Sequence, residues 1–349
     1  METKKELVVV TGGTGFIASN VIAQLLKQGY RVRTTMRSLA KKDLVITMLT
    51  NAGITDFSRL EFAEANLNSD DNWDQVMSGA TYVMSVASST PNREFTDAEA
   101  MTQTAVHGVL RVLKFARDTQ VKRVVLTSSF GAIGMGHPKD RVEPFTEKDW
   151  TNLQYPKLDS YQRSKTMAEH AAWNFIENEG DGLEMAAINP VGVMGPVLAS
   201  DFSHSNRQIQ EMLEGKVPAV PNVVSGYVDV RDVASLHVLA MTSPKANGER
   251  FLATTGETLS MLDVANVLRA AFPKLAKKLP NRVIPDVILK GLAKVTPSLR
   301  MVATLTGNFA DTSNAKAIEL LGWQPRSASE AIKATAQSMI DLVIVDVKK

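Results

Sequence analysis

Leu7-Val8-Val9-Val10-Thr11-Gly12-Gly13-Thr14-Gly15-Phe16-Ile17-Ala18 is the stretch that decides the fold of this chain. Its four leading apolar residues predict a buried parallel strand, and its glycines predict a sharp turn. Helix-favouring residues follow until Gly29 ends the run. A strand, a glycine turn and a helix in this order form an anion site, because unpaired amides and the positive dipole end of the helix face a pyrophosphate. The stretch therefore predicts dinucleotide binding, with Ala18 as the small residue where the helix packs on the strand.

The composition predicts an ordinary globular protein with one large α/β domain and a smaller lobe. The chain has 349 residues, of which 44% are apolar and 22% are charged. Its net charge of +2 provides no global field that would attract nucleic acid or a membrane. The absence of cysteine excludes disulfides, thiolate metal sites and cysteine nucleophiles. The five histidines are scattered without a paired spacing, so we predict no metal.

The chain shows no targeting or membrane-spanning segment. The polar residues 1–6 run directly into the first strand and leave no apolar signal segment. No run reaches the roughly 18 apolar residues that a bilayer requires. We therefore expect a cytoplasmic protein.

The loop after the second predicted strand, residues 30–36, indicates which dinucleotide is bound. Folds that prefer NAD place an acidic residue at this strand end, where it binds the ribose hydroxyls. Here no Asp or Glu occurs between Tyr30 and Lys42, whereas four basic residues do. Arg37 can pair with a 2′-phosphate through its planar guanidinium, and Lys41 adds a second charge. NADPH is favoured over NADH, with a merely solvated basic loop as the alternative.

Further strands are predicted at residues 60–63, 81–88, 121–127 and 183–188, with a helix from about residue 97 to 119. In an open parallel sheet, ligands sit beyond the carboxyl ends of the strands. The residues that follow these strands should therefore lie beside the cofactor.

Three side chains point to a reaction at that edge. Ser129 follows the fifth strand, and Tyr161 and Lys165 are four residues apart on a predicted helix, hence on one face. Tyrosine titrates near 10, and an ammonium one turn away should stabilise the phenolate and lower its pKa. The tyrosine would donate a proton while the serine holds a carbonyl oxygen. Ser128 is the alternative serine, but Ser129 stands directly before the Phe130-Gly131 turn.

Taken together, these motifs resemble the extended short-chain dehydrogenase/reductases of the NAD-dependent epimerase/dehydratase superfamily. Within that group the chain is similar to dihydroflavonol reductase-like enzymes and microbial NADPH-dependent aldehyde and carbonyl reductases. The resemblance covers almost the whole chain and rests on residues 10–19, 32–37, 86–88, 125–129, 161–165, 189–196, 227–234, 311–316 and 321–325.

The resemblance implies a Rossmann-type doubly wound parallel sheet in residues 1–190, to which later segments return. Residues 191–349 would form mainly a smaller α/β substrate-binding lobe. It also implies an oxidoreductase that moves a hydride from NADPH to the carbonyl of an aldehyde or ketone, with Tyr161 as general acid. The expected partner is this small carbonyl substrate, and the expected state is a monomer or homodimer.

The expected site residues fall into two further groups. Those expected to contact the cofactor are Thr11, Gly12, Thr14, Gly15, Phe16, Ile17, Arg37, Lys41, Asn66, Leu67, Val86, Ala87, Ser88, Thr127, Ser128, Tyr161, Lys165, Pro190, Val193 and Ser205. Those expected to contact the substrate are Ser89, Thr90, Phe130, Met194 and Tyr227.

Two alternatives remain open at this point. Nucleotide-sugar epimerases and dehydratases belong to the same superfamily, but dehydratases carry Thr-Asp-Glu where this chain has Ser129-Phe130-Gly131. Epimerases keep NAD tightly bound, whereas Arg37 favours an exchangeable NADPH. A non-catalytic NADP-binding regulator is the other alternative, although such proteins typically lose the tyrosine or the lysine.

Overall fold

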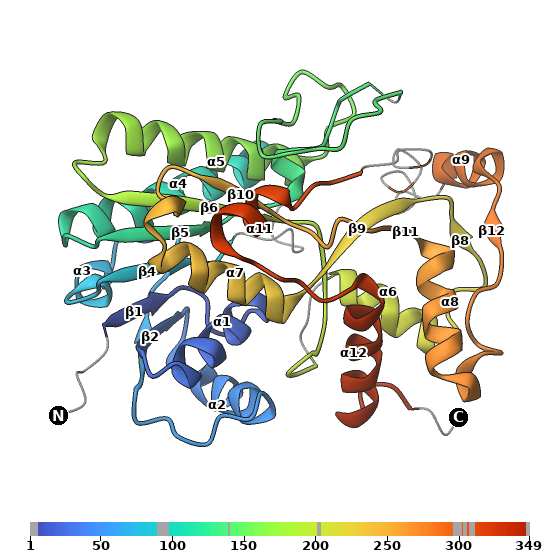
Figure 1. Ribbon diagram of the computed structural model, residues 1–349, viewed down its shortest axis with the longest axis horizontal. Helices are drawn as coiled ribbons and strands as arrows, with labels where there is room; N and C mark the ends of the chain where they lie inside the picture. Colours follow the sequence, from blue (N-terminus) through green and yellow to red (C-terminus); the bar gives the residue numbers. More distant parts are fainter. Residues whose placement is uncertain are drawn as a thin grey trace.

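The computed structural model describes residues 6–88, 98–138, 140–200, 204–295 and 311–346, together with residues 302 and 306. The chain forms a three-layered part built around a large parallel sheet, and a smaller part that extends beyond the carboxyl ends of its strands (Figure 1). The described chain begins at Glu6, directly before β1 of the large sheet, and its last described residues, 342–346, follow a helix of the smaller part.

The large sheet has seven strands in the order β10-β6-β5-β4-β1-β2-β3, and every neighbouring pair is parallel. The chain reverses its direction of winding between β1 and β4, which is where an open parallel sheet binds its ligand. The strands are β1 (Leu7–Val10), β2 (Arg31–Met36), β3 (Leu60–Glu64), β4 (Tyr82–Ser85), β5 (Arg123–Thr127), β6 (Glu184–Pro190) and β10 (Arg250–Ala253).

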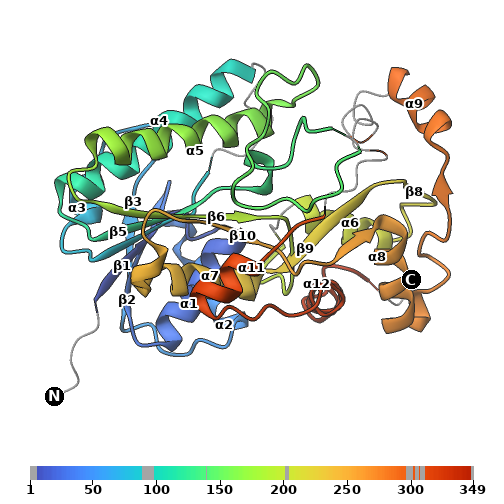
Figure 2. The same cartoon turned by 45° about the horizontal axis from the view of Figure 1, so that its top comes forward.

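Helices cover both faces of this sheet, as the views in Figures 1 and 2 show. One face carries α3 (Trp73–Met77), α4 (Ala98–Asp118) and α5 (Ser160–Glu179). The other carries α1 (Phe16–Lys27), α2 (Lys42–Asn51), α7 (Val230–Thr242) and α11 (Ala315–Leu321). The predicted doubly wound α/β fold is therefore confirmed.

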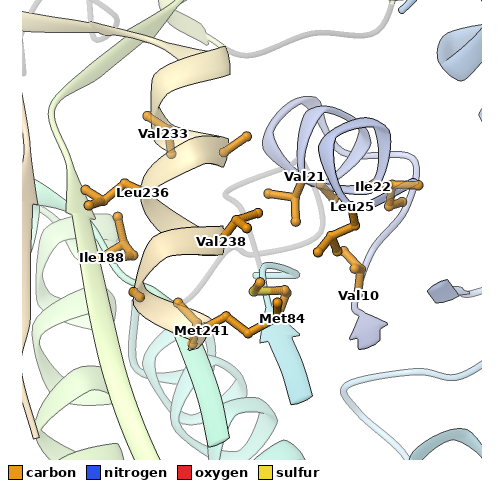
Figure 3. Close-up of a cluster of buried hydrophobic side chains, with 14 of the residues drawn as sticks. Val10, Val21, Ile22, Leu25, Met84, Ile188, Val233, Leu236, Val238 and Met241 are labelled. Carbon is orange, nitrogen blue, oxygen red and sulfur yellow. The ribbon is translucent and has the colours of Figure 1, made fainter. Parts of the chain in front are cut away.

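The core beneath α1 and α7 explains why these two helices lie side by side. Val21, Ile22 and Leu25 of α1 and Val233 and Leu236 of α7 are all fully buried. They meet over apolar side chains of the sheet strands (Figure 3). Burying one such side chain stabilises the fold by about 1.5–3 kcal/mol, so this contact fixes α7 to the sheet although α7 comes late in the sequence.

Within the described ranges, the smaller part contains two short sheets and four helices. Its strands are β7 (Gly192–Met194), β9 (Val224–Asp229) and β11 (Thr258–Ser260) in one sheet, and β8 (Val220–Pro221) and β12 (Val283–Ile284) in the other. Its helices are α6 (His204–Leu213), α8 (Met261–Ala271), α9 (Asp286–Val295) and α12 (Ala328–Asp341). Short 3-10 turns are η1 (Leu39–Lys41), η2 (Phe130–Ala132), η3 (Pro244–Ala246) and η4 (Pro273–Leu275). Because β10, α7 and α11 rejoin the large sheet, residues beyond 190 contribute to both parts.

Candidate active site

The glycine loop after β1 is shaped by two close approaches. Gly12 has a positive φ of 74°, and a Cβ there would lie 2.9 Å from the Cβ of Ala87. At Gly13 a Cβ would lie 2.2 Å from Oγ1 of Thr34, which is closer than any real contact. Both positions therefore require glycine, and the requirement at Gly13 was not among the expectations drawn from the sequence.

The start of α1 presents free backbone donors beside this loop. Gly15 occupies the N-cap position, and within the part of the chain that the structure describes no side chain caps the helix. Its first turn contains no acidic residue, and Thr14, Gly15, Phe16 and Ile17 are all at least partly exposed. This end of α1 has the unpaired amides and positive dipole that a pyrophosphate needs.

Thr11 joins two segments of the site through hydrogen bonds. Its side chain is fully buried, and Oγ1 accepts hydrogen bonds from the amides of Val86 at 3.0 Å and Ala87 at 2.9 Å. The Thr11 side chain therefore links the residues after β4 to the glycine loop. This is an indirect role in the site, in place of the expected direct contact with the cofactor. Val86, Ala87 and Ser88 are partly exposed at that exit.

The basic loop lies at the end of β2. Arg37 and Lys41 are exposed, and among the described residues neither makes an ion pair. Glu64, at the end of β3, also reaches this basic loop, where it accepts a hydrogen bond from the amide of Leu39 at 3.3 Å. No acidic side chain was predicted here from the sequence. Because Arg37 is exposed and makes no ion pair with a described residue, its guanidinium is available for a phosphate.

The loop after β3 carries the two other expected contacts. Asn66 is exposed, but its side-chain oxygen accepts a hydrogen bond from the amide of Asn68 at 3.1 Å. Leu67 packs against Gly108 of α4, and a Cβ added at Gly108 would lie 3.3 Å from the Cβ of Leu67. Leu67 also lines a cavity of about 20 Å³ between α4, α5 and the sheet.

Ser129, Tyr161 and Lys165 meet at the carboxyl edge of β5. Asp159 caps α5 by accepting from the amide of Gln162 at 2.9 Å, which starts the helix immediately before Tyr161. The Ser129 side chain interacts with the phenol of Tyr161, and its Oγ accepts a hydrogen bond from the amide of Gly131 at 3.1 Å. Lys165 is nearly buried, and its Nζ donates to the carbonyl oxygen of Thr127 at 3.4 Å.

The pKa values of this group differ from the expectation in one respect. Burial raises the pKa of Tyr161, and Asp159 adds to the rise, while the hydrogen bond from Ser129 acts in the opposite direction. The expected lowering by the lysine is therefore wrong in this structure. Burial lowers the pKa of Lys165 to about 8, and the negative charge of Glu169 partly opposes that fall.

The two candidate serines have different surroundings. Ser128 is buried and donates its hydroxyl hydrogen to Oε2 of Glu169 at 2.5 Å, away from Tyr161. Thr127 is also buried, and its hydroxyl lies 2.7 Å from Nε2 of His237. Only Ser129 of the two serines is placed beside the tyrosine.

The expected substrate residues are scattered more widely. Phe130 is half-buried and makes an edge-to-face contact with Phe145, with ring centroids 5.6 Å apart. Met194 is fully buried and Tyr227 is 5% exposed, both in the core of the smaller part, and their contact with a substrate stays a prediction. Burial raises the pKa of Tyr227 to about 12.

The remaining expectations concern five other positions. Ser89 and Thr90 lie outside the described residues. Pro190 and Val193 are buried in β6 and β7, and Ser205 is partly exposed on α6. Across the described ranges, no cluster of three His, Asp or Glu side chains has the arrangement of a metal site.

Comparison with known proteins agrees with this geometry. Residues 8–253 match the model of the "NAD dependent epimerase/dehydratase family". Cinnamoyl-CoA reductase 1 of Oryza sativa subsp. japonica is 35% identical over 274 residues, which cover 78% of this chain and 77% of that protein. Ketoreductase azaE of Aspergillus niger is 34% identical over 310 residues, which cover 82% of this chain and 88% of that protein.

Solved structures extend the likeness to the whole chain. The yeast methylglyoxal/isovaleraldehyde reductase Gre2, complexed with NADPH, superposes with a TM-score of 0.80. It is 27% identical, and the match covers 97% of this chain and 99% of that one. With the glycine loop, the seven-stranded sheet and the family match in place, this chain belongs to the NAD-dependent epimerase/dehydratase family.

Proposed function

We propose that this protein is an NADPH-dependent reductase that converts the carbonyl group of an aldehyde or ketone to an alcohol. The observation that carries the proposal is the meeting of Ser129, Tyr161 and Lys165 at the carboxyl edge of the sheet, the same edge from which the glycine loop leaves β1. The similarity to reductases of several carbonyl compounds supports the same reaction.

The residues present fit NADPH. The cradle formed by Gly12 and Gly13 would be filled by any Cβ, so the backbone there can approach a pyrophosphate closely. The uncapped start of α1 provides amide donors for the same group. Arg37, which is exposed and has no ion-pair partner among the described side chains, would bind the 2′-phosphate. The bound nicotinamide supplies the hydride.

Tyr161 would act as the general acid. Its raised pKa keeps the phenol protonated at neutral pH, so it can give its proton to the carbonyl oxygen as negative charge develops there. Ser129 would hold the same oxygen, because its hydroxyl already lies next to that of Tyr161. The buried ammonium of Lys165 would stabilise the phenolate that remains after the proton has left.

The substrate class follows from what the site lacks. No carboxylate follows Ser129, because Phe130 and Gly131 occupy the next positions, so the acid and base for water elimination are missing there. The half-buried ring of Phe130 presents an apolar wall instead. We therefore favour small aldehydes and activated ketones over nucleotide sugars, and net reduction over epimerisation.

We further propose that the enzyme works in the cytoplasm as a monomer or homodimer and binds no nucleic acid. The net charge of +2 supports the last point. In the described part of the chain, no helix has the length and apolar character needed to cross a bilayer. Light scattering coupled to gel filtration would measure the oligomeric state.

The direct test is NADPH oxidation with a panel of methylglyoxal, a ketoester, a dihydroflavonol, cinnamoyl-CoA and UDP-glucose. Tyr161→Phe should reduce kcat for an accepted aldehyde by about 10²–10⁴-fold while leaving NADPH binding intact, because only the proton donor is removed. Tyr155→Phe, in a loop outside the proposed chemistry, is the matched control and should retain activity. Full turnover by Tyr161→Phe would refute the mechanism, and turnover of UDP-glucose alone would refute the substrate class.

A further inference from the structure

A buried carboxylate one helical turn beyond Lys165 has no part in the function proposed so far. Glu169 lies on α5 and is 1% exposed. Because residues four apart share a helix face, its side chain lies on the same side of α5 as Lys165. A buried carboxylate is costly unless donors surround it, so its retention at this place requires an explanation.

Four donors fix this carboxylate. Oε2 accepts from Ser128 at 2.5 Å and from Nδ2 of Asn189 at 2.7 Å. Oε1 accepts from Nε of Arg250 at 2.6 Å and from Nε1 of Trp173 at 3.3 Å. Donors on both oxygens prevent the side chain from rotating, so the carboxylate of Glu169 is fixed in position.

Arg250 is itself held in place from other directions. Its Nη1 donates to the carbonyl oxygens of Glu147 at 2.7 Å and Asp149 at 2.8 Å. Its guanidinium lies 3.7 Å from the ring centroid of Trp150, whose other neighbour is the stacked ring of His170. The cation is therefore directed at Glu169 from β10 and cannot move toward Lys165.

The cavity of about 20 Å³ places Lys165 and Glu169 in one common space. Among the described residues that line it, they are the only charged ones. The wall contributed by α4 consists of Ala105, Gly108 and Val109, and the exit of β4 adds only small uncharged residues. Of the titratable groups around Lys165, Tyr161 lies on its own helix and Arg250 lies behind Glu169.

We propose that Glu169 is a positioning residue whose fixed negative charge keeps the buried side chain of Lys165 in its ammonium form and directed at the reaction edge. The proposal deepens the proposed function, because it assumes that the ammonium of Lys165 assists Tyr161. It also gives the second serine a role, since Ser128 holds Glu169 while Ser129 serves the substrate.

The test compares Glu169→Gln with Trp173→Phe in the full-length chain. Trp173→Phe removes one donor and leaves the carboxylate charged, whereas Glu169→Gln removes the charge. The ¹³C signal of the Lys165 Cε atom, assigned by its loss in Lys165→Met, is followed against pH. The midpoint should lie near 8 in the wild type and in Trp173→Phe. In Glu169→Gln it should fall by about one unit or more, because an opposite charge nearby shifts a pKa by roughly 1–3 units.

Glu169→Gln leaves Arg250 without its anion and is therefore exposed to misfolding. The double variant Glu169→Gln, Arg250→Gln removes both charges and should show the same fall, whereas Glu169→Asp should restore the midpoint at least in part. An unmoved midpoint in both charge-removing variants would overturn the proposal.

The pH profile of kcat/KM for aldehyde reduction separates this proposal from the function on which it rests. We expect its alkaline limb to move to lower pH together with the midpoint of Lys165. If the midpoint moves and the limb does not, the role of Glu169 stands and the catalytic role of Lys165 fails. If the alkaline limb of the kcat/KM profile moves in Trp173→Phe as well, a structural effect explains the shift in both variants, and the proposal is wrong.

Discussion

Acidification should destabilise this protein through His237, a fully buried residue of α7. Its Nδ1 lies 2.8 Å from the carbonyl oxygen of Val233, which can only accept, so Nδ1 carries the hydrogen. Nε2 must then accept from the hydroxyl of Thr127 at 2.7 Å. The neutral ring fits this site and a charged ring does not, because a second proton on Nε2 would remove the bond from Thr127 and bring an unpaired charge into the core.

The magnitude follows from the pKa. Burial lowers the pKa of His237 from its usual 6.5 to about 4 in the folded state. The unfolded chain therefore binds this proton below pH 6.5 while the folded chain does not, and stability falls as the pH falls through that window. The pKa differs by about 2.5 units between the two states, and each unit corresponds to about 1.4 kcal/mol. The free energy of unfolding should therefore fall by about 3 kcal/mol between pH 6.5 and pH 4.

Urea denaturation at a series of pH values measures this loss as a change in the free energy of unfolding. Carboxylates also titrate in this range, so the relevant quantity is the difference between the wild type and His237→Gln. Glutamine stays neutral, so the variant should be less stable than the wild type at neutral pH but should lose less stability on acidification. Parallel pH dependences of the two proteins would refute the argument.

Three other perturbations test the site and the core. Arg37→Ala should raise KM for NADPH far more than KM for NADH, because only NADPH carries the 2′-phosphate, and equal effects in steady-state kinetics would remove Arg37 from the phosphate site. Gly13→Ala should weaken NADPH binding in a fluorescence titration, since its Cβ would lie 2.2 Å from Oγ1 of Thr34, and Thr34→Ala in the same chain should restore part of the loss. Phe251→Ala should destabilise the fold by about 3–5 kcal/mol in urea, because the ring is fully buried in β10, and a loss below about 1 kcal/mol would contradict its place in the core.

Local patterns were sufficient to predict the fold because six strands of the large sheet have clear apolar runs in the sequence, whereas the seventh, β10, was not predicted. The apolar run before Gly12 and the four-residue spacing of Tyr161 and Lys165 both translate directly into a buried strand and a shared helix face. β6 extends to Pro190, beyond the predicted end at residue 188, since its backbone pairs with β10. That pairing joins segments far apart in the chain, and no local pattern signals it.

The site was less predictable because its details depend on such distant contacts. Met194 and Tyr227 stand at the expected positions but point into the core of the smaller part. Glu169 could have been noticed as a lone acid on the inner face of α5, yet three of its four donors come from β6, β10 and the residue after β5. The upward shift in the pKa of Tyr161 likewise depends on burial, which the spacing of two residues does not report.

The return of β10 to the edge of the large sheet means that the chain alternates between the two parts, with segments of the smaller part both before and after β10. A chain ended at residue 190 would leave β6 as an open edge strand with unpaired backbone groups. Such an edge promotes edge-to-edge aggregation. The truncation would also strip α7 from α1 and expose the apolar side chains between them. Grafting the lobe of another reductase onto this cofactor domain therefore needs junctions on both sides of α7 and β10, and a simple two-fragment chimaera would not preserve the nucleotide site.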